Sequence, residues 1–265
     1  LLPGLDVPAA VIGVGEKGYL TLELSVTAEG GHSSTPPKHT AIGILSRAVA
    51  RLEDRPLPAK MAYASRFLST IGPRMSFGYR IVFANQWLFS PIIARVLAGI
   101  PDTNAVIRTT TAATMFNAGV KENVLPTSAK AVVNFRLLPG DSIDSVIQYA
   151  KDVIDDSRVK VEALPGASEA SPISSTDSAS YRTLRESILQ VFGHPNMVVT
   201  PFLTLGATDA RHFAQVADNS FRFLGLDISK EDLKRIHGAA ERISTENYAQ
   251  LARLYRQIML NSGSK

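Results

Sequence analysis

Arg136 is the first residue whose type and position suggest chemistry, because it lies in a segment that otherwise reads as a buried strand. Residues 129–138 are rich in valine and other aliphatic residues, which is typical of a strand, and they include one cation, Arg136, and one amide, Asn134. Removing a charge from water costs several kcal/mol unless a partner compensates it. Arg136 therefore either points to solvent or binds an anion, and this segment alone leaves both interpretations open.

His32 lies in a loop whose composition could hold it in one position. Residues 29–37 read Glu-Gly-Gly-His-Ser-Ser-Thr-Pro-Pro, in which the glycines permit unusual backbone angles and the prolines end the preceding strand. A histidine in a loop is most often a solvated residue. In a stiffened loop it could instead be a positioned hydrogen-bond donor.

His237 is a second candidate, because it lies where an apolar stretch gives way to a glycine. A lone histidine in such a position is more often structural. Asp209, His212, Glu241 and His32 could join it in a set of metal ligands, but the chain has no H-E-x-x-H or comparable spacing. Spacing alone therefore does not assemble a metal site, and the chain also lacks a G-x-S-x-G turn and a phosphate-binding loop.

Composition bounds the possible functions of these residues. The chain of 265 residues suits two domains or one large one, and its 45% hydrophobic content is enough for a core. It has no cysteine, which excludes disulfides, a thiolate nucleophile and a cysteine zinc site. The excess of 28 basic over 24 acidic residues is small and spread out, and no nucleic-acid-binding motif accompanies it.

The ends and the hydropathy of the chain leave its compartment open. No stretch of about 20 apolar residues is present, so the sequence predicts no membrane-spanning helix. Residue 1 is Leu, and the first residues lack the basic start and small-residue cleavage site of a signal peptide. We therefore interpret the chain as a fragment or a processed product, either cytoplasmic or, if a signal was removed, secreted or periplasmic.

The central part of the chain is predicted to fold as β-α-β-β-α-β, which fits a compact ferredoxin-like domain. Its first strand alternates apolar and polar residues, the period of a half-buried strand, and its helices have apolar residues at helical spacing. Asp141 or Ser142 is positioned to cap the second helix. The predicted strands are 19–28, 106–117, 129–138 and 159–164, and the predicted helices are 40–53 and 143–154.

Residues 54–105 interrupt this domain with a mixture of cations and aromatic residues. One interpretation is a helical insertion that packs its aromatic side chains inward. The other is a basic, aromatic surface for a lipid-like substrate or a membrane interface. Residues 81–97 are predicted to be helical, with a break near Pro91.

The flanking segments have weaker patterns. Residues 15–18 are predicted as a turn, 166–178 as a linker, and Thr208 or Asp209 as the cap of a helix that opens in the loop 204–213. Ser244 is predicted to cap the last helix, which reaches about residue 261. The stripe predicted to be buried on that helix is Tyr248, Leu251, Ala252, Tyr255, Ile258 and Met259. The remaining elements are predicted as strands at 9–14, 198–200 and 221–224 and a helix at 181–191.

Five motifs in order resemble those of the aminoacylase/carboxypeptidase family of di-zinc hydrolases, in particular its carboxypeptidase S and N-fatty-acyl-amino-acid hydrolase branch. The resemblance extends over essentially the whole chain. Each motif is weak alone, whereas five in the family's order and spacing are specific. They are Gly-Gly-His32-Ser-Ser-Thr-Pro-Pro, Asn123-Val-Leu-Pro, Asn134-Phe-Arg136, Gly206-Ala-Thr208-Asp209 and Arg-Ile-His237-Gly.

The resemblance implies a role for each matching residue. His237 matches a zinc ligand, and His32 matches the lid histidine that reaches the active site of the partner subunit and stabilises the oxyanion. Asn123 and Arg136 match residues that hold the substrate, and Arg136 would clamp its carboxylate in a bidentate pair. Gly206, Thr208 and Asp209 match the loop that lines the site.

The resemblance also shows what this chain lacks. The family's other zinc ligands and its general-base Glu belong to an N-terminal half, and nothing here matches them. The expected domains are residues 1–16 as the end of a catalytic segment, 17–165 as a lid and dimerisation domain with its insertion at 54–105, and 166–265 as the C-terminal part of an α/β catalytic domain.

The implied function is zinc-dependent hydrolysis, with two zinc ions per site, of N-acyl amino acids or peptides that have a free carboxylate. It would be carried out by a homodimer of the parent protein, and the isolated chain is expected to be inactive. The alternative is a non-catalytic dimerisation module.

Overall fold

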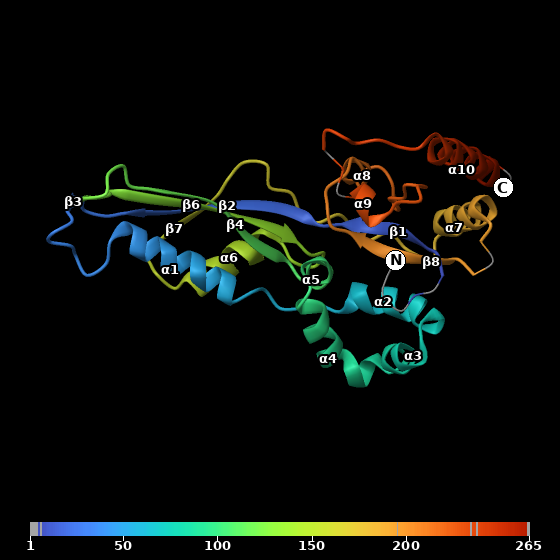
Figure 1. Cartoon of the computed structure of the whole chain (residues 1–265), viewed down its shortest axis with the longest axis horizontal. Coiled ribbons are helices and arrows are strands. Elements are labelled where there is room, and N and C mark those ends of the chain that lie inside the picture. The colour runs from blue at the N-terminus through green and yellow to red at the C-terminus, as the bar shows by residue number, and fades with distance from the viewer. Residues whose placement is uncertain (1–4, 6, 195, 234, 237, 264–265) are drawn as a thin grey trace.

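The computed structural model describes residues 5, 7–194, 196–233, 235–236 and 238–263. Its elements form a long unit at one end, here called the lid, and a smaller α/β segment at the other, and the helices α2, α3 and α4, within residues 62–98, lie below the α/β segment in this view (Figure 1). The lid sheet, the α/β sheet and a short ribbon are three separate sheets. The prediction of a mixed α/β fold is confirmed.

The lid is built on a four-stranded sheet in the order β4-β6-β2-β7, in which all neighbours are antiparallel. This is the strand order of a split β-α-β unit, so the predicted ferredoxin-like topology is present. The strands are β2 (Gly18–Thr27), β4 (Thr110–Ala118), β6 (Ser128–Leu137) and β7 (Lys160–Ala163). Thr110, and not residue 106, begins β4, because the preceding residues complete a helix.

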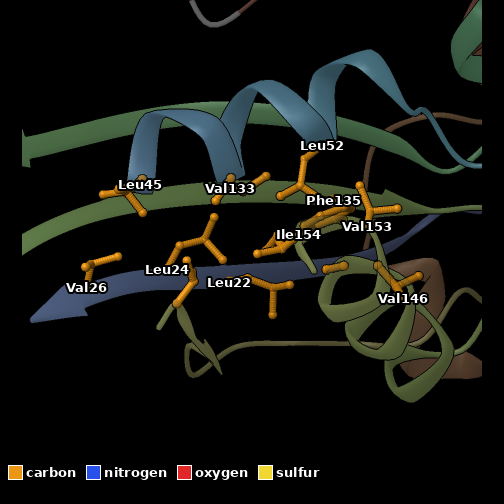
Figure 2. Packing of buried hydrophobic residues seen from close by; sticks show 14 of the residues in the cluster. Leu22, Leu24, Val26, Leu45, Leu52, Val133, Phe135, Val146, Val153 and Ile154 are labelled. Carbon is orange, nitrogen blue, oxygen red and sulfur yellow. The ribbon is translucent and has the colours of Figure 1, made fainter. Parts of the chain in front are cut away.

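Two helices, α1 (Ala41–Asp54) and α6 (Ile143–Ile154), pack on one face of this sheet. Figure 2 shows Leu22 of β2 and Phe135 of β6 among the helix side chains in the shared core. The Thr40 hydroxyl accepts from the Gly43 N–H at 3.1 Å and so caps α1. Ser142 caps α6 in a reciprocal capping box with Ser145, which resolves the choice left open by the sequence.

The α/β segment contains a parallel pair of strands, β1 (Ala9–Glu16) and β8 (Val198–Thr204). Two helices, α7 (Ala179–Phe192) and α10 (Thr245–Gly263), contribute to a separate core with β1. The short helices α8 (Ala210–Phe213) and α9 (Lys230–Leu233) follow β8. Parallel sheets usually have more strands and are covered on both faces, so this pair resembles the margin of a larger sheet.

The predicted turn at 15–18 is wrong, since β1 ends at Glu16 and β2 begins at Gly18 with only Lys17 between them. Hydrogen bonds continue across the junction: the Lys17 N–H donates to the Thr204 carbonyl at 3.1 Å. The segment 166–178 lies alongside this junction and exchanges backbone hydrogen bonds with β1 and β2, so it is an ordered part of the fold. At 221–224, where a strand was predicted, the structure has one bridge, between Gly13 and Arg222.

The face of α10 that packs against the core differs in part from the prediction. Ile258 of the predicted stripe does pack against the core beside the buried Leu254, whereas the predicted Tyr248, Tyr255 and Met259 are exposed. Ser244 does cap the helix, since its hydroxyl accepts from the Asn247 N–H at 3.0 Å. The helix has apolar residues on two faces, and the sequence did not identify which one meets α7.

The insertion is helical, as predicted, and forms α2 (Ala62–Ile71), a 3₁₀ turn (Gly72–Arg74), α3 (Phe77–Ala84), α4 (Gln86–Ala98) and α5 (Pro101–Ile107). The break falls at Asn85 and not at Pro91, which lies inside α4. The Asn85 side-chain amide donates to the Ile81 carbonyl at 2.9 Å and helps end α3. Among the described residues no single helix is long and apolar enough to cross a bilayer; α3 and α4 pass that test only together, and they are bent by 112°.

Candidate active site

His32 and Asn123 lie together at the far end of the lid, on a two-stranded ribbon. β3 (Gly31–His32) pairs antiparallel with β5 (Val124–Leu125). The Ser33 N–H donates to the Asn123 carbonyl at 3.2 Å. In Figure 1 this ribbon is at the opposite end of the lid from the α/β segment. The fold therefore brings together two residues that are 91 positions apart in the sequence.

The contacts of His32 determine which ring nitrogen carries the proton. The Ser34 backbone N–H donates to Nδ1 at 3.2 Å, and the Ser34 hydroxyl lies 2.8 Å from the same nitrogen. Because a backbone N–H can only donate, Nδ1 of the neutral ring is an acceptor and Nε2 carries the proton. The side chain is exposed, so this Nε2–H is a donor that a ligand can reach.

Asn123 presents an acceptor without a partner. Its Oδ1 atom is buried and has no hydrogen-bond partner among the described residues. A buried unsatisfied acceptor costs about 1–3 kcal/mol. An open groove of about 570 Å³ runs beside the ribbon and is lined in part by the neighbours Glu122 and Val124.

Arg136 lies at the opposite end of the lid sheet, where β6 pairs with the start of β2. Its guanidinium carbon is 4.7 Å from the ring centroid of Tyr19, the residue opposite it in the ladder. The residue is half-buried. Among the described residues, no carboxylate forms an ion pair with Arg136 and no acceptor receives a hydrogen bond from its side chain. Its five donors are therefore available to an anion.

Lys17 adds a second cation to this region. Its ammonium donates to the carbonyls of Ala105 at 3.0 Å and Arg108 at 2.8 Å, at the C-terminal end of α5. Burial, followed by the positive charge of Arg136, lowers the pKa of Lys17 from 10.5 to about 8, against an opposing effect of Asp141. Lys17 remains largely protonated at neutral pH and increases the positive potential near Arg136.

Thr208 is held by a buried carboxylate that the sequence did not single out. Glu16 is 2% exposed, and its Oε2 accepts from the Thr208 hydroxyl at 2.6 Å and the Thr208 N–H at 3.0 Å. Arg222 Nε donates to the same oxygen at 3.3 Å. Glu16 therefore fixes the start of the loop from the end of β1, next to Lys17.

The rest of this loop faces open space. A Cβ atom added to Gly206 would meet nothing within 4 Å, so the backbone there is accessible to a ligand. Asp209 occupies the N-cap position of α8 without making a side-chain cap; the Thr208 hydroxyl accepts from the Ala210 N–H at 3.3 Å instead. Asn134 is engaged in the sheet, since its amide donates to the Thr21 hydroxyl at 3.0 Å.

The candidate residues form two groups that one copy of the chain cannot bring together. Arg136 is opposite Tyr19 at the base of the sheet, and Ser128 is opposite Thr27 near the tip. The eight residue-to-residue steps from Ser128 to Arg136 extend over about 26 Å at about 3.3 Å per step. His32 and Asn123 lie at the tip, and Arg136 lies near the junction with Glu16 and Thr208.

The metal prediction cannot be placed on this structure. His237 lies outside the described residues. Within the described part of the chain no three His, Asp or Glu side chains are grouped so that they could hold a metal ion.

Sequence reasoning missed the three charged residues at the junction, Glu16, Lys17 and Arg222. Residues 15–18 have the composition of a turn, and Arg222 is in a short apolar stretch far along the chain. The sequence did contain a signal for this junction, which is a glutamate followed directly by a lysine at the end of a predicted buried strand. Buried charges require partners, so this pair could have indicated a site with charged contacts.

The fold is that of the M20 metallopeptidases. An M20 family metallo-carboxypeptidase from Sulfolobus solfataricus superposes with a TM-score of 0.59 over 95% of this chain and 64% of its own length. Its sequence identity is 16%, so this likeness concerns the fold alone. Residues 14–162 match the family described as the peptidase dimerisation domain, M20_dimer, and the chain belongs to this family.

The curated relatives are hydrolases and peptidases. The chain is 43% identical to a probable carboxypeptidase S-like 2 from Dictyostelium discoideum, over 99% of this chain and 50% of that protein. It is 41% identical to an N-fatty-acyl-amino acid synthase/hydrolase from Danio rerio, over 99% of this chain and 51% of that protein. The chain thus spans about half the length of these relatives, and the predicted family resemblance is confirmed.

Proposed function

We propose that this chain is part of an amide hydrolase that acts on N-acyl amino acids or peptides with a free carboxylate. The observation that carries the proposal is the half-buried Arg136 guanidinium, which has no anionic partner among the described residues and lies near Lys17. A planar carboxylate matches two donors of a guanidinium. The names of the relatives, carboxypeptidase S-like and N-fatty-acyl-amino acid synthase/hydrolase, agree with such a substrate.

The site is proposed to form between two copies of the chain. Arg136 and the Gly206–Thr208 loop would bind the substrate in one copy, and His32 and Asn123 of the other copy would complete the site. The separation of about 26 Å along the lid supports this division. The exposed Nε2–H of His32 is suited to donate to the oxygen on which negative charge develops during amide cleavage.

Zinc is proposed as the metal of the whole protein, with two ions per site and His237 as one ligand. The metallo-carboxypeptidase fold supports a metal in general. The remaining ligands and the general base would come from residues that this chain does not contain. The chain alone is therefore proposed to be inactive.

The experiment that tests the function uses the complete polypeptide that contains this chain. It is expected to bind close to two zinc ions per protomer and to release free amino acid from N-acyl amino acids, whereas the 265-residue chain alone should do neither. Metal analysis and an amino acid release assay measure this. A complete polypeptide that binds zinc without releasing amino acid would contradict the proposal and leave a dimerisation module as the function of this chain.

Strand β4 is the proposed dimer edge, because its composition differs from that of the other edge strand. β4 has nine residues without a charge, and its Met115 is 57% exposed. β7 has four residues, including the ion pair Lys160–Glu162 at 2.7 Å. Charged, short edges oppose pairing between chains, whereas long neutral edges permit it.

Met115→Lys should weaken the dimer by about 2–4 kcal/mol, because a two-fold interface contains each substitution twice and the buried area of the Met side chain is lost. Analytical ultracentrifugation of the 265-residue chain measures the dissociation constant. Ala163→Lys, which adds the same charge to β7, is the matched control and should leave the dissociation constant unchanged. Equal effects of the two substitutions would show that β4 is not the interface.

A further inference from the structure

The helices α3 and α4 form an arm that extends away from both sheets (Figure 1). Together with α2 they form a small core with Leu5 and Val198, and this core uses one side of the arm. On α4 the side chains that pack inward are Phe89, Ile93 and Leu97. The arm is thus attached to the protein along one stripe.

A second apolar stripe on α4 has no partner among the described residues. Leu88, Ile92 and Val96 recur every four residues on the outer side, and all are exposed, Ile92 by 61%. Trp87 is 81% exposed beside the bend, and Phe77 is exposed on α3. A helix that is apolar on all sides is usually buried in a protein core or in lipid.

The charges on the arm have one sign. From residue 55 to residue 101 the sequence contains six Arg and Lys residues and no Asp or Glu. Lys60 is paired with Asp141, at 2.5 Å. Arg74, Arg80 and Arg95 are exposed, and no described carboxylate forms an ion pair with them. The arm combines exposed apolar residues with free cations, the pattern of segments that lie in the interface of an anionic membrane.

The geometry limits how the arm can meet lipid. Its two helices have the combined hydropathy of a membrane span, but the bend of 112° at Asn85 prevents a straight crossing. Trp87 lies directly after the bend, and indole rings favour the head-group region of bilayers. We propose that the α3–α4 arm docks the protein on an anionic lipid surface, with Trp87, Leu88 and Ile92 inserted between head groups and Arg80 and Arg95 near phosphates.

Trp87 provides a direct test, because it is the single tryptophan of the chain. With vesicles of phosphatidylserine and phosphatidylcholine in equal parts, its fluorescence emission should shift to shorter wavelength and be quenched by brominated acyl chains. With phosphatidylcholine alone both effects should be weaker. The absence of a shift with the anionic vesicles would overturn the proposal.

Two pairs of variants distinguish specific binding by the arm from nonspecific adsorption of the protein to vesicles. Trp87→Ser with Ile92→Ser should reduce co-sedimentation with the anionic vesicles at least roughly tenfold. Tyr248→Ser with Val216→Ser, equally exposed residues off the arm, should not. Arg80→Gln with Arg95→Gln should reduce it roughly tenfold, whereas the same charge change at Arg185 and Arg256 should not.

Other occupants of this face would give different results. If the arm covered a second copy of the chain, the Trp87 and Ile92 variant would change the oligomeric state in light scattering and leave vesicle binding unchanged. If it covered the rest of a longer polypeptide, that polypeptide would fail to bind vesicles that the 265-residue chain binds. Either result would overturn the lipid proposal, and neither depends on amide hydrolysis.

Discussion

Arg136→Met in the complete polypeptide should lower kcat/KM for N-acyl amino acids by about 100–1,000-fold, which corresponds to about 3–4 kcal/mol of lost binding to the carboxylate. Arg136 contributes little to the stability of the fold, since the contact described for its side chain is the one with the Tyr19 ring. The loss should therefore appear in catalysis and hardly in the free energy of unfolding. Arg136→Lys should give an intermediate value, because an ammonium keeps the charge but not the planar pair of donors.

The control for this prediction is a substrate without the carboxylate. An N-acyl amino acid amide retains the bond that is cleaved but lacks the anion, so the wild-type enzyme should hydrolyse it poorly and Arg136→Met should hardly change that rate. The variant should therefore lose its preference for the acid over the amide. A similar decrease for both substrates would mean that Arg136 acts on the architecture of the site and not on the carboxylate.

Local patterns were sufficient to predict the lid. Alternation in β2 and helical spacing in α1 and α6 identify these elements, because in each case one face meets a shared core and the other meets solvent. The errors occur where two patterns compete. Tyr248, Tyr255 and Met259 form a regular stripe on α10, but Leu254 on another face packs against the core.

The candidate site was predictable only in part, for a physical reason. Motifs marked His32, Asn123, Arg136 and Thr208, but no local pattern states that His32 and Arg136 are at opposite ends of one sheet. That separation follows from strand register, which depends on pairings between residues about a hundred positions apart. The family resemblance implied that His32 reaches a partner subunit, and the distance between His32 and Arg136 along the sheet supports the proposal that two copies share the site.

Glu16 provides the largest expected effect on stability. Its carboxylate is at the meeting point of β1, the Thr208 loop and Arg222, and Arg222 also donates to the Ser171 hydroxyl at 3.2 Å and the Ser220 carbonyl at 2.8 Å. Glu16→Gln leaves the Arg222 charge buried without a counter-ion. We expect the free energy of unfolding to decrease by about 3–5 kcal/mol, measured by urea denaturation.

The exposed pair Glu23–Lys130, at 2.8 Å, is the matched control for this prediction, and Glu23→Gln should cost less than about 1 kcal/mol. If the cost at Glu16 arises from an uncompensated charge, Glu16→Gln combined with Arg222→Met should be less harmful than the sum of the single changes. Additive losses would instead mean that Glu16 acts mainly through Thr208. In that case Thr208→Val should reproduce most of the effect, because it removes the hydroxyl that Glu16 holds while leaving the Glu16–Arg222 pair in place.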